Sequence, residues 1–100
     1  MGHVELRPRN ANEVDVSYTI NPDHRRRGFA TRAVRLASTW AFEHGFSRIV
    51  AEWDARNAAS GGVARAAGFV VVDRRPGGRT YENGGTPGDA VIAELRPSEM

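Results

Sequence analysis

The sequence predicts a single domain of the α/β or α+β class, built around a mixed β-sheet with the element order ββαβαββ. Three observations predict it. The chain has 100 residues, apolar and polar residues alternate in several short segments, and two longer segments show helical spacing. A chain of this length forms one hydrophobic core, so we assign residues 1–100 to a single domain. The composition, 40% hydrophobic and 26% charged, is typical of a folded protein.

The first two strands are expected at residues 3–9 and 14–20. In the second, apolar residues at even positions alternate with polar residues at odd positions, which is typical of a half-buried strand. Only turn-forming residues separate the two segments. The pair therefore predicts an antiparallel hairpin.

A helix is expected from about residue 30 to the glycine at position 45, which is a typical helix C-cap. Its apolar face comprises Ala30, Ala33, Val34, Ala37, Trp40 and Ala41, and its other face comprises Arg32, Arg35, Ser38 and Glu43. A strand is expected at residues 46–53. Strand, helix and strand form a βαβ unit, so the two strands should be parallel with a right-handed crossover.

A second helix is expected at residues 58–67, with Asn57 as its N-cap and Gly68 after its end. Gly61 and Gly62 lie inside it and should each weaken it by roughly 1 kcal/mol. The last strands are expected at residues 69–74 and 90–95. We expect the glycine-rich segment between them to form a long loop.

Composition excludes several classes of site. The chain has no cysteine, so disulfides, thiolate nucleophiles and cysteine zinc sites are excluded. The three histidines have no metal-ligand spacing, and we expect no metal. No apolar run has the length of a membrane span, and the N-terminus lacks the apolar segment of a signal peptide, so we expect a cytoplasmic protein without membrane contact.

The segment RRRGFA at residues 25–30 is a candidate anion site. It lies between an expected strand and an expected helix, where the first-turn N–H groups have no intrahelical partner and favour phosphate. Gly28 and the small Ala30 allow a ligand to approach the backbone. Alternatives are a solvated basic loop or a nucleic-acid contact, although a net charge of +2 is too small to predict nonspecific nucleic-acid binding.

Four motifs in order resemble the GNAT superfamily of acyl-CoA-dependent N-acyltransferases. They are Arg25-x-x-Gly28-x-Ala30, the strand Asp15-Val16-Ser17-Tyr18, the helix start Asn57-Ala58-Ala59-Ser60, and Gly68-Phe69. Their spacing is similar to the branch that contains ribosomal-protein N-terminal acetyltransferases. The family's first strand and one or two helices would precede the segment that begins here. We therefore expect a shortened domain, or a second chain, such as a homodimer partner, that completes it.

The resemblance implies acetyl-CoA as the acyl donor. First-turn backbone amides would bind the CoA pyrophosphate, and the end of the second strand would lie along the pantetheine arm. The implied cofactor-binding residues are Tyr18, Thr19, Ile20, Arg25, Arg26, Arg27, Gly28, Phe29, Ala30, Thr31, Asn57 and Ser60. Asn57 is equally explained as a helix cap, and Ser60 as a polar residue of a first helical turn.

The implied reaction is transfer of an acetyl group to a primary amine, with Asp15, Ser60 and Ile20 as the candidate catalytic residues. The Ile20 N–H would polarise the thioester carbonyl. Asp15, or alternatively Glu52, would take the amine proton. Many relatives have a tyrosine acid where this chain has Ala64, so Ser60 would assist the leaving thiolate through a water.

Three functions remain open at this point. The first is an N-acetyltransferase acting on a protein N-terminal α-amine or a small amine. The second is a shortened CoA-binding domain without catalysis, and the third is a nucleic-acid-binding module that uses the three consecutive arginines. Tyr81, in the expected loop, is a candidate for the acceptor site.

Overall fold

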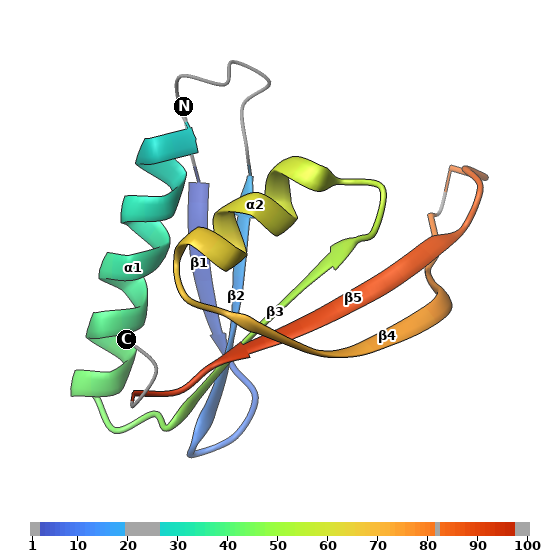
Figure 1. Cartoon of the computed structure of the whole chain (residues 1–100). Coiled ribbons are helices and arrows are strands. Elements are labelled where there is room, and N and C mark those ends of the chain that lie inside the picture. The colour runs from blue at the N-terminus through green and yellow to red at the C-terminus, as the bar shows by residue number, and fades with distance from the viewer. Residues whose placement is uncertain (1–2, 20–26, 82, 98–100) are drawn as a thin grey trace.

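The computed structural model describes residues 3–19, 27–81 and 83–97 (Figure 1). The elements follow the predicted order. They are β1 (His3–Pro8), β2 (Glu13–Thr19), α1 (Arg27–Glu43), β3 (Arg48–Asp54), α2 (Ala58–Ala66), β4 (Val70–Arg79) and β5 (Gly88–Leu95). The mixed α/β fold predicted from the sequence is confirmed.

The five strands form one sheet in the order β1-β2-β3-β5-β4. β1 and β2 form the predicted antiparallel hairpin, and β2 and β3 are parallel, as the strand–helix–strand pattern predicted. The remaining pairs, β3 with β5 and β5 with β4, are antiparallel. Side chains from α1 and α2 share one hydrophobic core with alternate residues of β2, β3 and β5, so both helices cover the same face of the sheet.

The pairing of β2 with β3 ends before the strands do. Parallel pairing covers residues 13–16 of β2 and 48–51 of β3, although the strands continue to Thr19 and Asp54. Figure 1 shows the two strands diverging toward their C-terminal ends. α1 begins at this same end of the sheet (Figure 1). The divergence thus leaves an opening at the end of the sheet at which α1 begins (Figure 1).

The predicted faces of α1 need two corrections. Ser38, expected on the polar face, is fully buried, and Trp40, expected on the apolar face, is 51% exposed. Burial of Ser38 is tolerated because its hydroxyl donates to the Val34 carbonyl at 2.7 Å. Trp40 instead stacks on His44 at the end of the helix, with 4.0 Å between ring centroids.

α2 begins at the predicted cap. The Asn57 side-chain oxygen accepts a hydrogen bond from the Ser60 N–H at 3.1 Å. Gly61 faces the sheet, and a Cβ there would lie 3.0 Å from the indole nitrogen of Trp53. Gly62 faces open space. Gly61 therefore permits close packing of α2 on β3, whereas Gly62 has no such role.

β4 is longer than predicted. It was expected to end at residue 74, but it continues to Arg79, which pairs with Gly88 of β5. Two irregularities in register, one between Val71 and Asp73 and one between Arg75 and Arg79, accommodate the extra residues. Pairing with β5 therefore overrides the local preference of the Pro-Gly-Gly segment for a turn.

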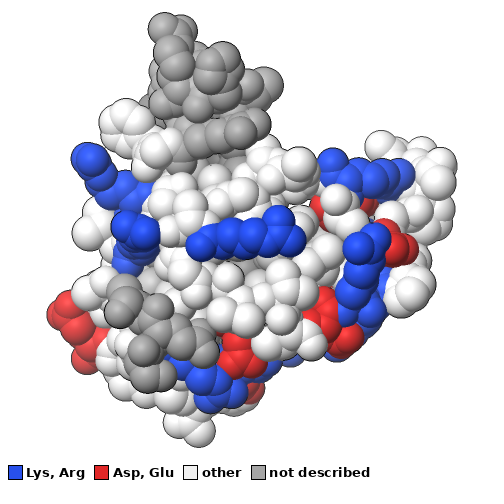
Figure 2. All heavy atoms as spheres, viewed as in Figure 1, with Lys and Arg blue, Asp and Glu red and all other residues white. Residues whose placement is uncertain are grey.

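Most arginines of the described residues lie beside a carboxylate. The ion pairs include Arg48 with Glu13, Arg56 with Asp54 and Arg74 with Asp89, at 2.6–2.9 Å. On the face in Figure 2, basic side chains are spread over the surface, and acidic side chains lie beside many of them. No helix of the described residues is long and apolar enough to cross a membrane.

Candidate functional site

The opening between β2 and β3 is a cleft of about 700 Å³. Its lining comes from the ends of both strands, the start of α2 and the end of β4. The lining residues are Val16, Ser17, Tyr18, Glu52, Trp53, Asp54, Arg56, Asn57, Ser60, Arg79 and Tyr81. The site therefore follows from one feature of the fold, the early end of parallel pairing.

The first turn of α1 contains no acidic residue and begins at Arg27. Gly28 is exposed, and a Cβ added to it would meet nothing within 4 Å. Ala30 is buried in the core, which fixes the turn against the sheet, and Phe29 is 73% exposed. This part of the predicted anion site thus has first-turn backbone N–H groups without intrahelical partners, and open space beside Gly28 among the described residues. Ile20, Arg25 and Arg26 lie outside the described residues.

Tyr18 connects β2 to α2. Its hydroxyl donates to the Ser60 carbonyl oxygen at 2.7 Å, and burial raises the pKa of Tyr18 to about 12. The phenol is therefore protonated at neutral pH and committed to this bond. Ser60, which is 7% exposed, lies between the Tyr18 bond on its carbonyl and the Asn57 bond on its N–H.

A buried carboxylate lies at the other side of the cleft. Asp54, at the end of β3, is 8% exposed and accepts hydrogen bonds from Arg56 and from the Tyr81 hydroxyl. The Arg56 side chain, followed by Tyr81, holds the pKa of Asp54 well below its usual range. Asp54 is consequently ionised at neutral pH and is a poor proton acceptor.

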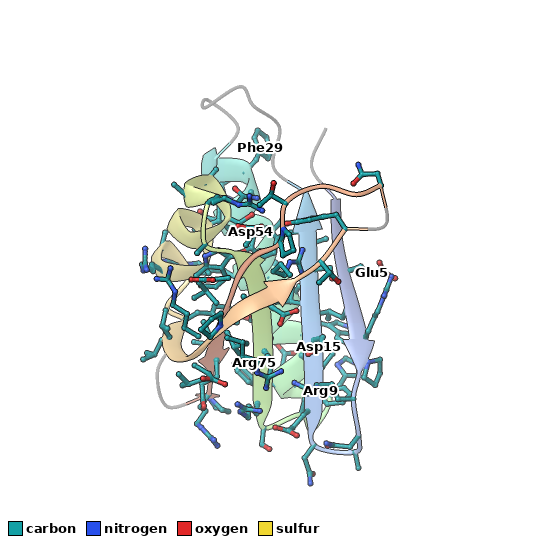
Figure 3. The ribbon with its side chains drawn as sticks, turned by 90° about the vertical axis from the view of Figure 1, so that its right-hand side faces the viewer. Glu5, Arg9, Asp15, Phe29, Asp54 and Arg75 are labelled. Carbon is teal, nitrogen blue, oxygen red and sulfur yellow. The ribbon has the colours of Figure 1, made fainter. Side chains whose placement is uncertain are left out.

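Asp15 lies on a different surface. It lines a second cavity of about 330 Å³ on the sheet face that the described helices do not cover, and its carboxylate lies 3.4 Å from the Arg9 guanidinium. Figure 3 shows Asp15, Arg9 and Arg75 together on this face. Glu52 and Arg79 line both cavities, with 3.4 Å between their side chains. Glu52 is thus the carboxylate that the two cavities share.

The structure brings Tyr18, Asn57 and Ser60 together in the lining of the cleft. Thr19 ends β2 and pairs with His3 of β1, and Thr31 lies in the first turns of α1. Asp15 does not line the cleft and belongs to the second cavity. Ala64, where many relatives have a tyrosine, is fully buried in the core.

Sequence reasoning missed four residues of the cleft: Trp53, Asp54, Arg56 and Arg79. Asp54 and Arg56 could have been found, because polar residues at the C-terminal end of a strand of an α/β sheet lie at its carboxyl edge, where ligands bind. Trp53 is apolar and gave no such indication. Arg79 gave no such indication, since it lies in a glycine-rich segment. Tyr81 does line the cleft. Among the described residues, no group of three or more His, Asp or Glu side chains has a geometry that would hold a metal ion.

A cleft between diverging parallel strands, at the end of the sheet where a helix begins (Figure 1), is typical of ligand-binding α/β domains, and comparison with known proteins places the chain among them. The family model described as acetyltransferase (GNAT) domain matches residues 1–70. The chain belongs to the GNAT family, as its motifs predicted. No curated protein matches it.

Solved structures have the same fold. Ribosomal-protein-S5-alanine acetyltransferase from Vibrio fischeri is 25% identical, with a TM-score of 0.79, over 95% of this chain and 53% of that one. A mutant of spermidine N-acetyltransferase from Vibrio cholerae is 22% identical, with a TM-score of 0.81, over 97% and 58%. A GNAT family acetyltransferase from Elizabethkingia anophelis with acetyl-CoA bound is 14% identical, with a TM-score of 0.76, over 95% and 67%. The chain thus spans just over half the length of the first two structures.

Proposed function

We propose that this chain carries the acetyl-CoA site of an N-acetyltransferase that acts on a primary amine. One observation supports the proposal: in a member of the GNAT family, β2 and β3 stop pairing and leave a cleft at the end of the sheet at which α1 begins (Figure 1). Unpaired strand edges and the first-turn N–H groups of a helix then lie at the same end of the sheet. They suit the amides and the phosphates of one extended ligand.

The described residues fit acetyl-CoA at both of its ends. Gly28 leaves open space at the first turn of α1, where the pyrophosphate would approach the backbone N–H groups of residues 27–31. Residues 18 and 19, at the end of β2, would offer backbone partners to the pantetheine arm. Asn57 and Ser60 line the cleft near the expected place of the thioester.

Acetyl-CoA supplies an activated thioester carbonyl carbon. The amine nitrogen forms a C–N bond to this carbon, the C–S bond breaks, the amine loses a proton, and the CoA thiolate takes one up. Glu52 is the best-placed carboxylate for the proton, because it lines the cleft, while Asp15 is paired with Arg9 in the other cavity. A thiol with a pKa near 8.5 leaves with little assistance.

The acceptor is proposed as a primary amine, and the relatives differ within this class. One is named for an alanine of a ribosomal protein and another for spermidine. An α-amine, with an ordinary pKa of about 8, is partly neutral at pH 7, whereas a lysine amine, at about 10.4, is almost wholly protonated. We therefore propose an α-amine as the acceptor that needs least help from a base.

The test is a thermal shift with acetyl-CoA, followed by thiol release with an amine panel. The panel contains an alanine-initiated peptide, the same peptide N-terminally blocked, spermidine, and a lysine side-chain amine. Because the chain has no lysine, its own background acetylation is confined to the N-terminal amine. Stabilisation and amine-dependent thiol release support the proposal. The absence of both contradicts it.

A second candidate function is a CoA-binding domain without catalysis. It is favoured by Ala64, which is fully buried at the position where many relatives have a tyrosine acid. It predicts the same thermal shift with no thiol release for any amine. A nucleic-acid-binding module predicts instead an affinity that falls steeply with salt and no response to acetyl-CoA.

We also propose that a second copy of the chain completes the domain. β1 is an edge strand of the sheet, and the face bearing Asp15 has no covering helix among the described residues. Light scattering at micromolar concentration should then give about twice the monomer mass. A monomer at all concentrations would contradict the homodimer.

A further inference from the structure

Helix α1 carries an apolar stripe on its outer surface. Phe29, Leu36 and Trp40 are each at least 51% exposed, and the partly buried Ala33 lies between the first two along the helix. The spacing 29, 33, 36, 40 places these four side chains on one face of the helix, and it is the spacing found in helix–helix contacts. We call them the α1 stripe. Large apolar side chains that gather on one exposed face mark an interaction surface.

The α1 stripe faces away from α2. The Arg35 guanidinium donates to the Ala66 carbonyl at the end of α2, at 2.6 Å, so α2 lies on the Arg35 side of α1. At about 100° per residue, the members of the stripe lie roughly 100–160° around the helix axis from Arg35. On its other side α1 contacts β1, which Figure 1 draws beside it. The α1 stripe is therefore turned toward the β1 side of the molecule.

β1 is an edge strand that carries apolar side chains on the helix face. The sheet order gives β1 one partner strand among the described residues, so one row of its backbone N–H and C=O groups is available to another strand. Val4 and Leu6 pack against the core from this strand and are only partly buried. Figure 3 shows Glu5 at this edge of the sheet. The edge of β1 and the α1 stripe thus lie on the same side of the molecule.

The charges of β1 select one register for pairing with an identical strand. In an antiparallel pair centred on Leu6, Glu5 lies opposite Arg7 of the second copy, and the reverse pair follows by symmetry. Because Arg7 also bonds Glu5 within one strand, at 3.1 Å, the four side chains would form one alternating cluster. The same register places Leu6 opposite Leu6 and Val4 opposite Pro8. A pair centred on Glu5 would instead oppose two glutamates, and these like charges disfavour it.

Each feature of this side is complementary to itself, as a two-fold interface requires. The edge of β1 pairs with an identical edge, Glu5 pairs with Arg7, and each α1 stripe supplies apolar surface to the other copy. A two-fold axis perpendicular to the sheet keeps both α1 helices on one face, with the two stripes along the joined strands. A second copy of this chain therefore fits this side better than an unrelated partner.

We propose that two copies of the chain join through β1, antiparallel and centred on Leu6, and that this contact covers the α1 stripe. The inference rests on the self-association proposed above, and it goes further by naming the surface and the register. The lining of the cleft includes no residue of β1 or of the α1 stripe, so the contact leaves the cleft open. Ligand binding and self-association can therefore be measured separately.

The register is tested with single cysteines, because the chain has none of its own. In the pair centred on Leu6, the two Cα atoms of residue 6 lie about 4.5–5.5 Å apart, within the range of a disulfide. L6C should therefore form a covalent dimer under mild oxidation at micromolar concentration. V4C is the matched control on the same strand and face. Its two copies lie four residues out of register, roughly 13 Å apart, so V4C should stay monomeric on a non-reducing gel.

The apolar contact is tested by the mass in solution, measured by analytical ultracentrifugation. L36E places a charge in the α1 stripe at a residue that is 66% exposed, so the monomer should fold normally. We expect the dimer dissociation constant to rise roughly tenfold to a hundredfold, the factor for the loss of a buried leucine. V72E is the matched control, since Val72 is 47% exposed on β4 at the opposite edge of the sheet, and it should leave the dissociation constant unchanged.

The charge pair gives a third measurement. E5R should weaken the dimer because it places like charges opposite each other, and E5R/R7E should restore it because the pair is then reversed. A dimer that persists unchanged in both L36E and E5R, or equal cross-linking of L6C and V4C, overturns this inference alone. If L36E does not fold, the comparison of L6C with V4C decides.

A wild type that stays monomeric at all concentrations refutes both the self-association and this inference. The proposed acetyltransferase function is decided by a different readout, the thermal shift and thiol release with acetyl-CoA. Its failure would leave the cross-linking of L6C as it is, so the two failures are distinguishable.

Discussion

Gly28 and Gly62 are both helix glycines at which an added methyl group meets no neighbour within 4 Å. Gly28 lies in the first turn of α1, and Gly62 lies in α2 outside the cleft lining. G28A should therefore fold normally but weaken acetyl-CoA binding by roughly tenfold, since the methyl group occupies the approach to the first-turn amides. Calorimetric titration with acetyl-CoA measures the change. G62A is the control and should bind acetyl-CoA like the wild type.

Asp54 should make the stability of the protein depend on acidic pH. Because the Arg56 and Tyr81 hydrogen bonds depress its folded-state pKa, the ionised form stabilises the fold above the unfolded pKa of about 3.9. This stabilisation is lost as pH falls from about 4 toward the depressed folded value. Urea unfolding should show D54N less stable than the wild type at pH 7, with the difference shrinking at pH 3. A difference that stays constant between these pH values would show that Asp54 has an ordinary pKa.

For single residues, the sequence predicts those hydrogen bonds whose two partners are close together along the chain. Asn57 was predicted as a cap because the cap and the N–H it accepts from are three residues apart. The bond from Tyr18 to Ser60 spans 42 positions, and that from Tyr81 to Asp54 spans 27. No local pattern encodes such pairs, because they exist only once the sheet has formed.

At the scale of elements, α2 contains a matched pair of glycines with opposite environments. G62A should stabilise the protein by about 1 kcal/mol, because alanine has the higher helix propensity and the site is open. G61A should gain less or destabilise, because its methyl group would press on the Trp53 indole at 3.0 Å. Urea unfolding of both variants checks this. Equal gains would show that α2 does not pack closely on β3.

Element boundaries were predicted well where the pattern is periodic and poorly where tertiary pairing decides. The hairpin strands and both helices follow from alternation, spacing and caps. β4 extends through Pro76, Gly77 and Gly78, residues that locally favour a turn. The reason is that β5 supplies a partner strand, and the gain from pairing exceeds the local preference.

For the whole molecule, the proposed ligand should stabilise the fold by mass action. A ligand that binds only the folded state adds about 2.7 kcal/mol at one hundred times its dissociation constant. Acetyl-CoA should therefore raise the melting temperature progressively with concentration, and added free CoA should compete. The same titration in 0.5 M salt should retain most of the effect if main-chain contacts dominate. A shift that saturates at equimolar ligand yet is abolished by salt would contradict this mode of binding.

For the whole molecule, the order of the elements and the mixed sheet could be predicted from the sequence, but the point at which β2 and β3 separate could not. A βαβ segment between a hairpin and a terminal strand pair predicts a mixed sheet. The point at which β2 and β3 separate, after Val16 and Ala51, has no counterpart in the apolar pattern, which continues along both strands. Tyr18, Asn57 and Ser60 were predicted as site residues through the resemblance to a family, while the Asp54 side of the cleft became visible only in three dimensions.

The intrinsic fluorescence of Trp53 can report on ligand binding in the cleft. Its indole is only 5% exposed, yet the residue lines the cleft and lies against Gly61. Trp40, the other tryptophan, is half exposed on α1, so W40F would leave a single fluorophore with the blue-shifted emission of a buried indole. A ligand that enters between β2 and β3 would then change that emission, and stopped-flow fluorescence could time donor and acceptor arrival without any label.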